Sequence, residues 1–124
     1  MIGYVTLGTN DLPRATAFYD ALCTELGAKR IMETDHFVGW GTGMDKPLLM
    51  VFIPDDGKPA TVGNGVMVAL QSESAEDVKR FHAKALELGG ANEGDPGPRG
   101  DGFYGAYFRD LDGNKLNFFC VTGA

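Results

Sequence analysis

The sequence predicts an α+β protein in which one order of elements (strand, helix, strand, strand, strand) occurs twice. Residues 4–28 align with residues 67–91 without a gap, at an offset of 63 (67 − 4). Each aligned segment begins with a short predicted strand and continues with the 3.6-residue periodicity of an amphipathic helix. Strand-rich sequence follows each helix, so the two halves of the chain are predicted to be two copies of one βαβββ module.

The two predicted helices have recognisable ends and one apolar face each. In the first copy Asn10 or Asp11 is a candidate N-cap, with Pro13 in the first turn. In the second copy Ser74 is the candidate N-cap, with Asp77 three residues on. Both helices are predicted to end at glycine, which readily adopts the left-handed conformation of a C-terminal cap. The apolar faces consist of Leu12, Ala15, Phe18, Leu22 and Leu26 in the first helix, and Val78, Phe81, Ala85 and Leu88 in the second.

Three strands are predicted after the first helix, and two well-defined strands after the second. The first set is KRIMET, HFVGWGT and PLLMVFIP, and the second is FYGAYFRD and NKLNFFCV, preceded by a poorly defined ANEG segment. Asp112-Gly113 is predicted to form a two-residue hairpin turn. An offset of 67 (117 − 50) aligns the last strands and places Met50 opposite Asn117. The same offset places Trp40 opposite Tyr107.

A linker is predicted near the middle of the single domain, residues 1–124. The segment PDDGKPATVGN, residues 54–64, combines proline, glycine and charge, which is typical of a linker. It separates module one (residues 1–53) from module two (residues 65–124).

Two further features have structural interpretations. Residues 93–102, EGDPGPRGDG, are predicted to be an irregular loop at a rim, where Arg99 is either solvated or in contact with an anionic group. Cys23 and Cys120 lack CxxC spacing and lie in apolar periodic segments, so they are predicted to be buried free thiols.

Composition argues against two classes of partner. The chain is 44% hydrophobic and 23% charged, with a formal net charge of −6. Binding to nucleic acid needs clustered Lys and Arg, and the sequence has no basic stripe. No stretch approaches the roughly 18 apolar residues of a membrane span, and MIGYVTLGTN is not a charged leader. We therefore expect a cytoplasmic protein with neither a nucleic-acid nor a membrane partner.

Three segments resemble the vicinal oxygen chelate superfamily, which includes glyoxalase I, bleomycin-resistance proteins and extradiol dioxygenases. YVTLGTNDLPRATAFYDALCTELGA resembles its first strand and helix, GVMVALQSESAEDVKRFHAKALELGG the second copy, and FYGAYFRDLDGNKLNFF the closing hairpin. The resemblance covers essentially the whole chain. It implies paired βαβββ modules whose eight strands form an open, curved mixed sheet around a cavity, and it implies a two-fold symmetric homodimer.

The resemblance also implies where a metal ion would be held. In metal-dependent members, His or Glu side chains on the first and fourth strands of the modules hold a divalent cation. The corresponding positions here are Tyr4, Met50, Met67 and Asn117. Phenol, thioether and amide groups are poor ligands for such a cation. We therefore expect no metal site and no cofactor.

Side chains that alternate along the predicted strands supply a candidate binding surface. Asn117 is either a polar group on the wet side of the sheet or a hydrogen-bonding group for a ligand. His36 is either a general base or anchor, or a surface or capping group. Trp40 and Tyr107 either stack on a flat ligand or fill the core. The predicted ligand-binding residues are Tyr4, Thr6, His36, Trp40, Met50, Phe52, Met67, Tyr107, Asn117 and Phe119.

Three functional classes follow from the sequence. The preferred one is a protein that binds a small organic molecule in the sheet cavity without a metal, as the bleomycin-resistance branch does. The second is a metal-dependent lyase, isomerase or dioxygenase that uses non-standard ligands. The third is a non-catalytic scaffold or regulatory module, because fold does not determine function. The sequence identifies neither the ligand nor a catalytic residue.

Overall fold

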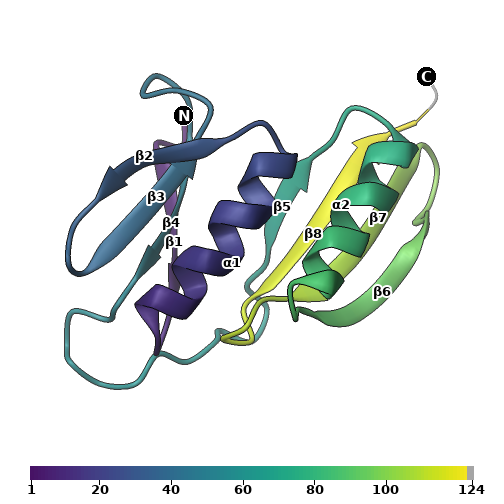
Figure 1. Cartoon of the computed structure of the whole chain (residues 1–124). Helices are drawn as coiled ribbons and strands as arrows, with labels where there is room; N and C mark the ends of the chain where they lie inside the picture. Colours follow the sequence, from purple (N-terminus) through teal and green to yellow (C-terminus); the bar gives the residue numbers. More distant parts are fainter. Residues whose placement is uncertain (123–124) are drawn as a thin grey trace. The chain divides into compact units, whose positions relative to one another are not determined.

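The computed structural model describes residues 1–122, which form two compact units (Figure 1). The first unit is Met1–Val62 and the second begins at Gly63, so the division falls inside the segment expected to be a linker. Asn10 holds the end of the first unit in place: its side chain accepts a hydrogen bond from the Ala60 amide (2.6 Å) and donates one to the Ala60 carbonyl (3.2 Å). Asn10 is thereby occupied with Ala60 and is not the helix cap.

The first unit has one helix and one mixed four-stranded sheet. The sheet order is β1-β4-β3-β2; β1 and β4 are parallel and the other neighbours are antiparallel. The elements are β1 (Tyr4–Gly8), α1 (Leu12–Glu25), β2 (Lys29–Glu33), β3 (Phe37–Gly41) and β4 (Leu48–Phe52).

The second unit repeats this arrangement. Its sheet order is β5-β8-β7-β6, and β5 and β8 are again the parallel pair. The α+β fold with two βαβββ modules is therefore confirmed, with the strands in two open four-stranded mixed sheets. The elements are β5 (Val68–Gln71), α2 (Ala75–Glu87), β6 (Ala91–Pro98), β7 (Phe103–Arg109) and β8 (Lys115–Val121).

Capping residues fix both ends of each helix. Asp11 and Ser74 are the N-caps, and each side chain accepts a hydrogen bond from a backbone N–H three residues on, at 3.0 and 3.1 Å. Gly27 (φ +76°) and Gly89 (φ +105°) follow the helices in the left-handed region, as predicted. Neither helix in residues 1–122 is long and apolar enough to cross a membrane.

Each helix covers one face of its own sheet with its apolar residues. Phe81 of α2 contacts Phe118 of β8, with ring centroids 5.5 Å apart. Cys23 and Cys120 are buried and free, as predicted, and burial raises the pKa of the Cys23 thiol to about 12. The buried residues of the helices are Ala15, Phe18, Tyr19, Leu22 and Cys23 in α1, and Val78, Phe81, His82 and Ala85 in α2.

Strand register confirms two of the sequence offsets. Thr6 pairs with Met50 in the first unit, and Ala69 pairs with Asn117 in the second. Thr6 and Ala69 differ by 63 (69 − 6), and Met50 and Asn117 differ by 67 (117 − 50). The first and last strands of the two modules are thus equivalent residue for residue, as the sequence alignment predicted.

The third strand of each module follows a different offset. Gly39 of β3 pairs with Met50, whereas Tyr107 of β7 pairs with Asn117. Gly39 and Tyr107 are therefore equivalent, at an offset of 68 (107 − 39). The predicted equivalence of Trp40 and Tyr107 is wrong by one residue, and Trp40 corresponds instead to Phe108. In a strand a shift of one residue moves a side chain to the opposite face.

The prediction of an irregular segment at residues 93–102 is also wrong in part. β6 continues to Pro98 and pairs with β7, with register shifts on either side of Gly94. β6 is the edge strand of its sheet, where a proline does not break a ladder hydrogen bond and an extra residue can bulge outward. Edge position therefore explains how a segment rich in proline and glycine forms a strand.

The last hairpin has a longer turn than predicted. Only Gly113 has a positive φ (+88°), and the loop runs from Asp110 to Asn114. A carboxylate oxygen of Asp110 accepts hydrogen bonds from the backbone N–H groups of Asp112 and Asn114, both at 2.9 Å. The Asp110 side chain therefore organises this turn.

Candidate functional site

The face of each sheet that points away from the unit's own helix, here called the far face, carries most of the predicted ligand-binding residues. Trp40 and Phe118 contact α1 and α2 respectively, so the side chains that alternate with theirs point to the far face. Far-face positions in the first unit are Tyr4, Thr6, Phe37, Gly39, Met50 and Phe52, and in the second unit Ala69, Gly105, Tyr107, Asn117 and Phe119.

Asn117 stands in the middle of the second far face with an unused hydrogen-bond acceptor. It lies on β8, between Ala69 of β5 and Tyr107 of β7. Its side chain is 1% exposed, and its Oδ1 has no hydrogen-bond partner in residues 1–122. Buried polar groups in folded proteins nearly always have a partner, so this amide is an exception that needs an explanation.

Two cations flank the ring of Tyr107, the cross-strand neighbour of Asn117. The Cζ atom of Arg99 is 5.4 Å from the ring centroid, and the Nζ atom of Lys115 is 5.5 Å from it. A third cation, Arg109, donates to Glu93 at 2.5 Å, and this hydrogen bond lowers the pKa of the Glu93 carboxyl. The far face of the second unit is therefore locally basic.

An aromatic pair lies beside the Asn117 row. The rings of Phe119 and Phe103 stack with centroids 5.2 Å apart and an angle of 9° between their planes. Gly105 is the cross-strand partner of Phe119, and a Cβ atom at Gly105 would lie 3.4 Å from the Phe103 ring. A small side chain at this position would thus be in ordinary van der Waals contact with the Phe103 ring.

The far face of the first unit differs at the equivalent positions. Met50, which corresponds to Asn117, is 3% exposed and lies over Gly39: a Cβ atom at Gly39 would be 3.1 Å from its Cγ. Phe52 stacks on Phe37 with centroids 4.6 Å apart. Tyr4 is 60% exposed. The buried centre of this face is apolar and has no equivalent of the Asn117 amide.

Two of the predicted residues, Met67 and His36, lie just outside the strands, and a third, Thr6, lies on an exposed part of the far face. Met67 precedes β5 and is 40% exposed. His36 precedes β3 and is exposed, which suits the surface interpretation of that residue. Thr6 is on the far face and exposed.

Trp40 does not lie on the far face, and its predicted place among the ligand-binding residues is corrected. It is 1% exposed and packs against Tyr19 of α1, with ring centroids 5.4 Å apart. Its Nε1–H donates to Oδ1 of Asp20 on α1 at 2.9 Å. The one-residue error in register described above placed this side chain on the wrong side of β3.

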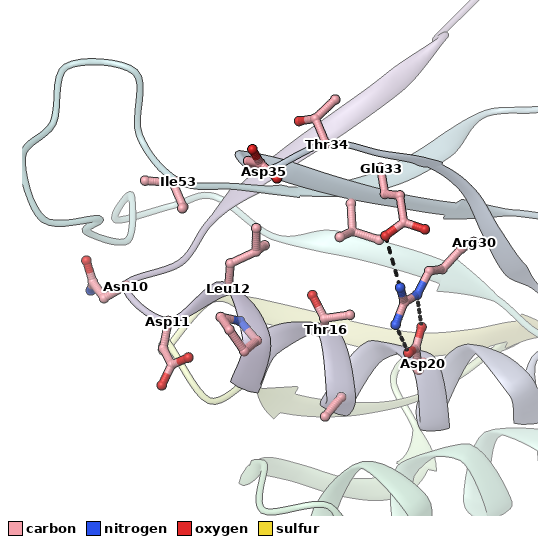
Figure 2. A pocket seen from close by; sticks show the side chains of 13 residues that line it. Asn10, Asp11, Leu12, Thr16, Asp20, Arg30, Glu33, Thr34, Asp35 and Ile53 are labelled. Carbon is pink, nitrogen blue, oxygen red and sulfur yellow. Dashed lines mark hydrogen bonds and ion pairs between the residues drawn. The ribbon is translucent and has the colours of Figure 1, made fainter.

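A groove in the first unit lies between α1 and the β2–β3 end of the sheet (Figure 2). Its volume is about 730 Å³. Figure 2 shows Arg30 between Asp20 on α1 and Glu33 on β2; these three side chains form an ion-pair network. The lining residues are Asn10, Asp11, Leu12, Pro13, Thr16, Ala17, Asp20, Arg30, Glu33, Thr34, Asp35, Val38 and Ile53.

The charged groups at the centre of this groove are occupied with each other. Hydrogen bonds from Arg30 and, to a smaller degree, from Trp40 hold the pKa of the Asp20 carboxyl below its usual range, against the opposing effect of burial. The same pairing raises the pKa of Arg30. This network joins α1 to β2 and β3, whereas Oδ1 of Asn117 has no hydrogen-bond partner in the described residues. The unused acceptor makes the second far face the stronger candidate site.

The residues at the four positions implied for a metal do not fit one. Tyr4, Met50, Met67 and Asn117 offer a phenol, two thioethers and an amide, and none of these is an anionic or imidazole ligand. Residues 1–122 contain no group of three or more His, Cys, Asp or Glu side chains placed to hold a metal ion.

Comparison with known proteins places these observations in a family. The family model described as Glyoxalase/Bleomycin resistance protein/Dioxygenase superfamily matches residues 1–118. Among solved structures, a glyoxalase/bleomycin resistance protein from Albidiferax ferrireducens is similar, with 35% identity, a TM-score of 0.88, and coverage of 97% of this chain and 98% of that one.

Two further structures are similar at lower identity. A hypothetical protein from S. aureus is 29% identical, with a TM-score of 0.72 and coverage of 98% of this chain and 96% of that one. A lactoylglutathione lyase from Agrobacterium tumefaciens is 20% identical, with a TM-score of 0.72 and coverage of 97% and 92%, and this likeness shows the fold alone. No curated protein matches the chain.

Proposed function

The chain belongs to the glyoxalase/bleomycin resistance protein/dioxygenase superfamily, and from this premise we propose that it binds a small organic molecule without a protein-bound metal. The proposed site is the far face of the second unit, around Asn117, Tyr107 and Phe119. The observation that carries the proposal is the buried Oδ1 of Asn117, which has no partner in residues 1–122.

An unpaired buried amide is unfavourable for the protein alone. Leaving such an acceptor without a hydrogen bond costs about 1–3 kcal/mol. A ligand that donates a hydrogen bond to Oδ1 would remove this penalty on binding. The neighbouring rings of Tyr107 and Phe119 supply the apolar surface that small-molecule sites combine with a few polar groups.

The chemistry of the four implied metal positions supports binding without a metal. A phenol, two thioethers and an amide cannot replace carboxylate or imidazole ligands for a divalent cation. The proposal therefore uses Asn117 as a hydrogen-bonding group and not as a metal ligand.

We further propose that the protein is a cytoplasmic homodimer. The homodimer is implied by the family resemblance, in which modules from two chains complete each cavity.

The test of the proposed function is a binding screen read at Asn117 itself. Monocyclic aromatic compounds, both charged and neutral, are titrated into ¹⁵N-labelled protein while the side-chain amide signals of Asn117 are followed by NMR. We expect at least one class of compound to shift these signals. The variant Asn117→Leu, which keeps the volume but removes the amide, should lose that binding.

Met50→Leu is the matched control, because Met50 is the equivalent residue of the first unit. It should bind as the wild type does. Compounds that bind equally well to Asn117→Leu would contradict the proposed site. Retention of about one metal ion per chain, lost in Asn117→Leu, would favour a metal-dependent lyase, isomerase or dioxygenase instead.

A further inference from the structure

The sequence contains one Asn-Gly pair, Asn64-Gly65, and it lies in an exposed connection between the two units. The first unit ends at Val62 and the second begins at Gly63. Residues 61–67 are all exposed and belong to no helix or strand. The pair is therefore held by neither sheet, and its conformation depends on local interactions.

A backbone hydrogen bond closes the turn around this pair. The Val66 N–H donates to the Gly63 carbonyl at 3.2 Å, and Gly65 has a φ of +96°. Glycine adopts this left-handed conformation without strain. The Gly65 N–H donates to no backbone carbonyl in residues 1–122. A Cβ atom at Gly65 would meet no heavy atom within 4 Å beyond its chain neighbours, so the backbone at this residue is uncrowded.

We infer that Asn64 is a site of spontaneous covalent modification, at which the asparagine is converted to aspartate and isoaspartate. The inference concerns the connection between the units and is independent of the proposed binding function. The attacking group is the backbone nitrogen of Gly65, and its target is Cγ of Asn64. These atoms belong to adjacent residues, so the reaction is intramolecular, which favours it. Glycine adds no side chain that would hinder their approach.

The reaction is balanced without an oxidant, a reductant or a cofactor. The nitrogen of Gly65 loses its proton and attacks Cγ of Asn64, a C–N bond forms, and the side-chain nitrogen leaves with that proton as ammonia. The product is a five-membered cyclic imide. Water then opens the ring. Breaking the bond between the nitrogen and Cγ gives aspartate, and breaking the bond between the nitrogen and the main-chain carbonyl carbon gives isoaspartate.

The modification changes the charge of the chain and the length of the connection. Either product changes the formal net charge from −6 to −7 (−6 − 1). Isoaspartate also carries the main chain through its Cβ and Cγ, so it lengthens the connection between the two units by one atom. Because the pair lies outside the strands of both sheets, we expect each unit to keep its fold.

The fold protects the other four asparagines from this reaction. A residue with a side chain follows each of them in the sequence. Their own side chains are hydrogen-bonded or buried: Asn10 is bonded to Ala60, Asn92 to Asp95 and Asn114 to Asp110, and Asn117 is 1% exposed. Reaction at such a site needs local opening first, and an open state that is populated one-tenth of the time slows it about tenfold.

Peptide mapping of aged protein tests the inference. The full chain is incubated at physiological temperature for several weeks, and its digests are analysed by mass spectrometry with electron-transfer fragmentation, which distinguishes aspartate from isoaspartate. We expect conversion at Asn64 to be at least about tenfold faster than at any other asparagine. It should also be faster in mildly alkaline than in mildly acidic buffer, because the attacking nitrogen must lose its proton.

A comparison in urea separates the contribution of the fold from that of the sequence. Unfolding should accelerate conversion at the four protected asparagines. The rate at Asn64 should change by less than about twofold, because the folded protein already leaves this turn open to reaction.

Two variants and one control identify the reacting pair. Asn64→Gln keeps the amide but requires a larger ring, and Gly65→Ala places a Cβ atom beside the attacking nitrogen. Each should slow the appearance of the more acidic form on ion exchange at least about tenfold. Val66→Ala is the matched control, since it changes an exposed residue of the same turn and leaves the pair intact. It should convert as the wild type does.

Three outcomes would overturn the inference. In the first, Asn64 stays intact while another asparagine converts. In the second, Asn64 converts at least about tenfold faster in urea than in the folded protein, which would mean that the fold protects it. In the third, the acidic form appears in Asn64→Gln at the rate of the wild type, which would place the reaction elsewhere in the chain.

Discussion

At the scale of single residues, Asn117 and Met50 show that equivalent positions of the two modules have different surroundings. Both occupy the centre of the last strand on the far face, paired with Ala69 and Thr6 respectively. Met50 fills its surroundings with apolar contacts over Gly39. Asn117 instead keeps a buried acceptor unpaired beside a tyrosine. Because an unpaired buried acceptor is unfavourable, we expect the second position to contribute less to stability than the first.

Asn117→Leu should therefore make the protein more stable. The substitution removes an unpaired buried amide at little change in volume, so we expect the free energy of unfolding to rise by about 1 kcal/mol. Urea unfolding of wild type and variant measures this difference. A loss of stability of similar size would show that the amide is satisfied in the folded protein and would remove the main support for the site.

Asp20 gives a prediction about pH. Its pKa is lower in the folded protein than its ordinary value of 3.8, mainly because of Arg30. A carboxyl whose pKa is lower in the folded than in the unfolded protein stabilises the folded state at pH values above its unfolded pKa. This stabilisation is lost as the pH falls through the folded pKa. Asp20→Asn should therefore be less stable than wild type at pH 7, by less than about 1 kcal/mol because the pair is partly exposed.

The difference in stability between the wild type and Asp20→Asn should shrink below pH 4. Thermal melts from pH 7 to pH 3 would show it, with Glu76→Gln as a control from an exposed helical ion pair. A gap between wild type and Asp20→Asn that stays constant down to pH 3 would argue that Asp20 acts through its hydrogen-bond geometry and not through its charge.

At the scale of elements, the register of the third strand in each module decides which side chains reach the far face. Gly39 and Tyr107 are equivalent, and each is paired with the central residue of the last strand. The first unit combines a glycine with a long Met50, and the second combines a large tyrosine with a short Asn117. In each pair one large side chain faces a smaller residue, and the large side chain is on β4 in the first unit and on β7 in the second.

Gly39→Tyr should be destabilising because the new side chain meets Met50, and overpacking of this kind costs about 1–3 kcal/mol. The double variant Gly39→Tyr/Met50→Asn reproduces the pair of the second unit and should recover part of the loss. A double-mutant cycle by urea unfolding measures the coupling, which we expect to be about 1 kcal/mol or more. Additive single effects would mean that the two pairs are not equivalent.

The sequence predicted most elements because their signals are local. The caps at Asp11 and Ser74 and the glycines after the helices depend on residues a few positions apart. The continuation of β6 beyond ANEG to Pro98 was missed because its proline and glycine content is tolerated only at a sheet edge, which is a tertiary property. The bond between Trp40 and Asp20 could not be predicted, because it depends on how α1 packs on β3. The unpaired state of Asn117 likewise depends on its neighbours in the folded sheet.

At the scale of the whole molecule, the two units have one plan: a parallel outer pair, an antiparallel continuation and a helix over one face. The two sheets therefore have the same topology, and they differ in the residues on their far faces. The first far face has an apolar centre, and the second carries the amide, the two cations beside Tyr107 and the stacked rings. The two modules thus differ in the polarity of their far faces.

The proposed homodimer makes a prediction about size. Chains of 13.3 kDa should sediment as a two-chain species at micromolar concentration, since each cavity in this fold is expected to be completed by a second copy. Sedimentation velocity over a range of concentrations measures the species present. A stable single-chain species throughout that range would contradict the proposed assembly.

The position of Trp40 makes it possible to follow the unfolding of the first unit by fluorescence. It is the single tryptophan of the chain, and its ring is enclosed between β3 and α1 with its N–H bonded to Asp20. Its emission therefore reports the integrity of the first unit alone, whereas circular dichroism averages over both helices. Coincident transitions would mean that the two halves unfold as one cooperative body. An emission change that precedes the loss of helix would mean that the halves melt separately, so that the second can keep its fold while the first is already open.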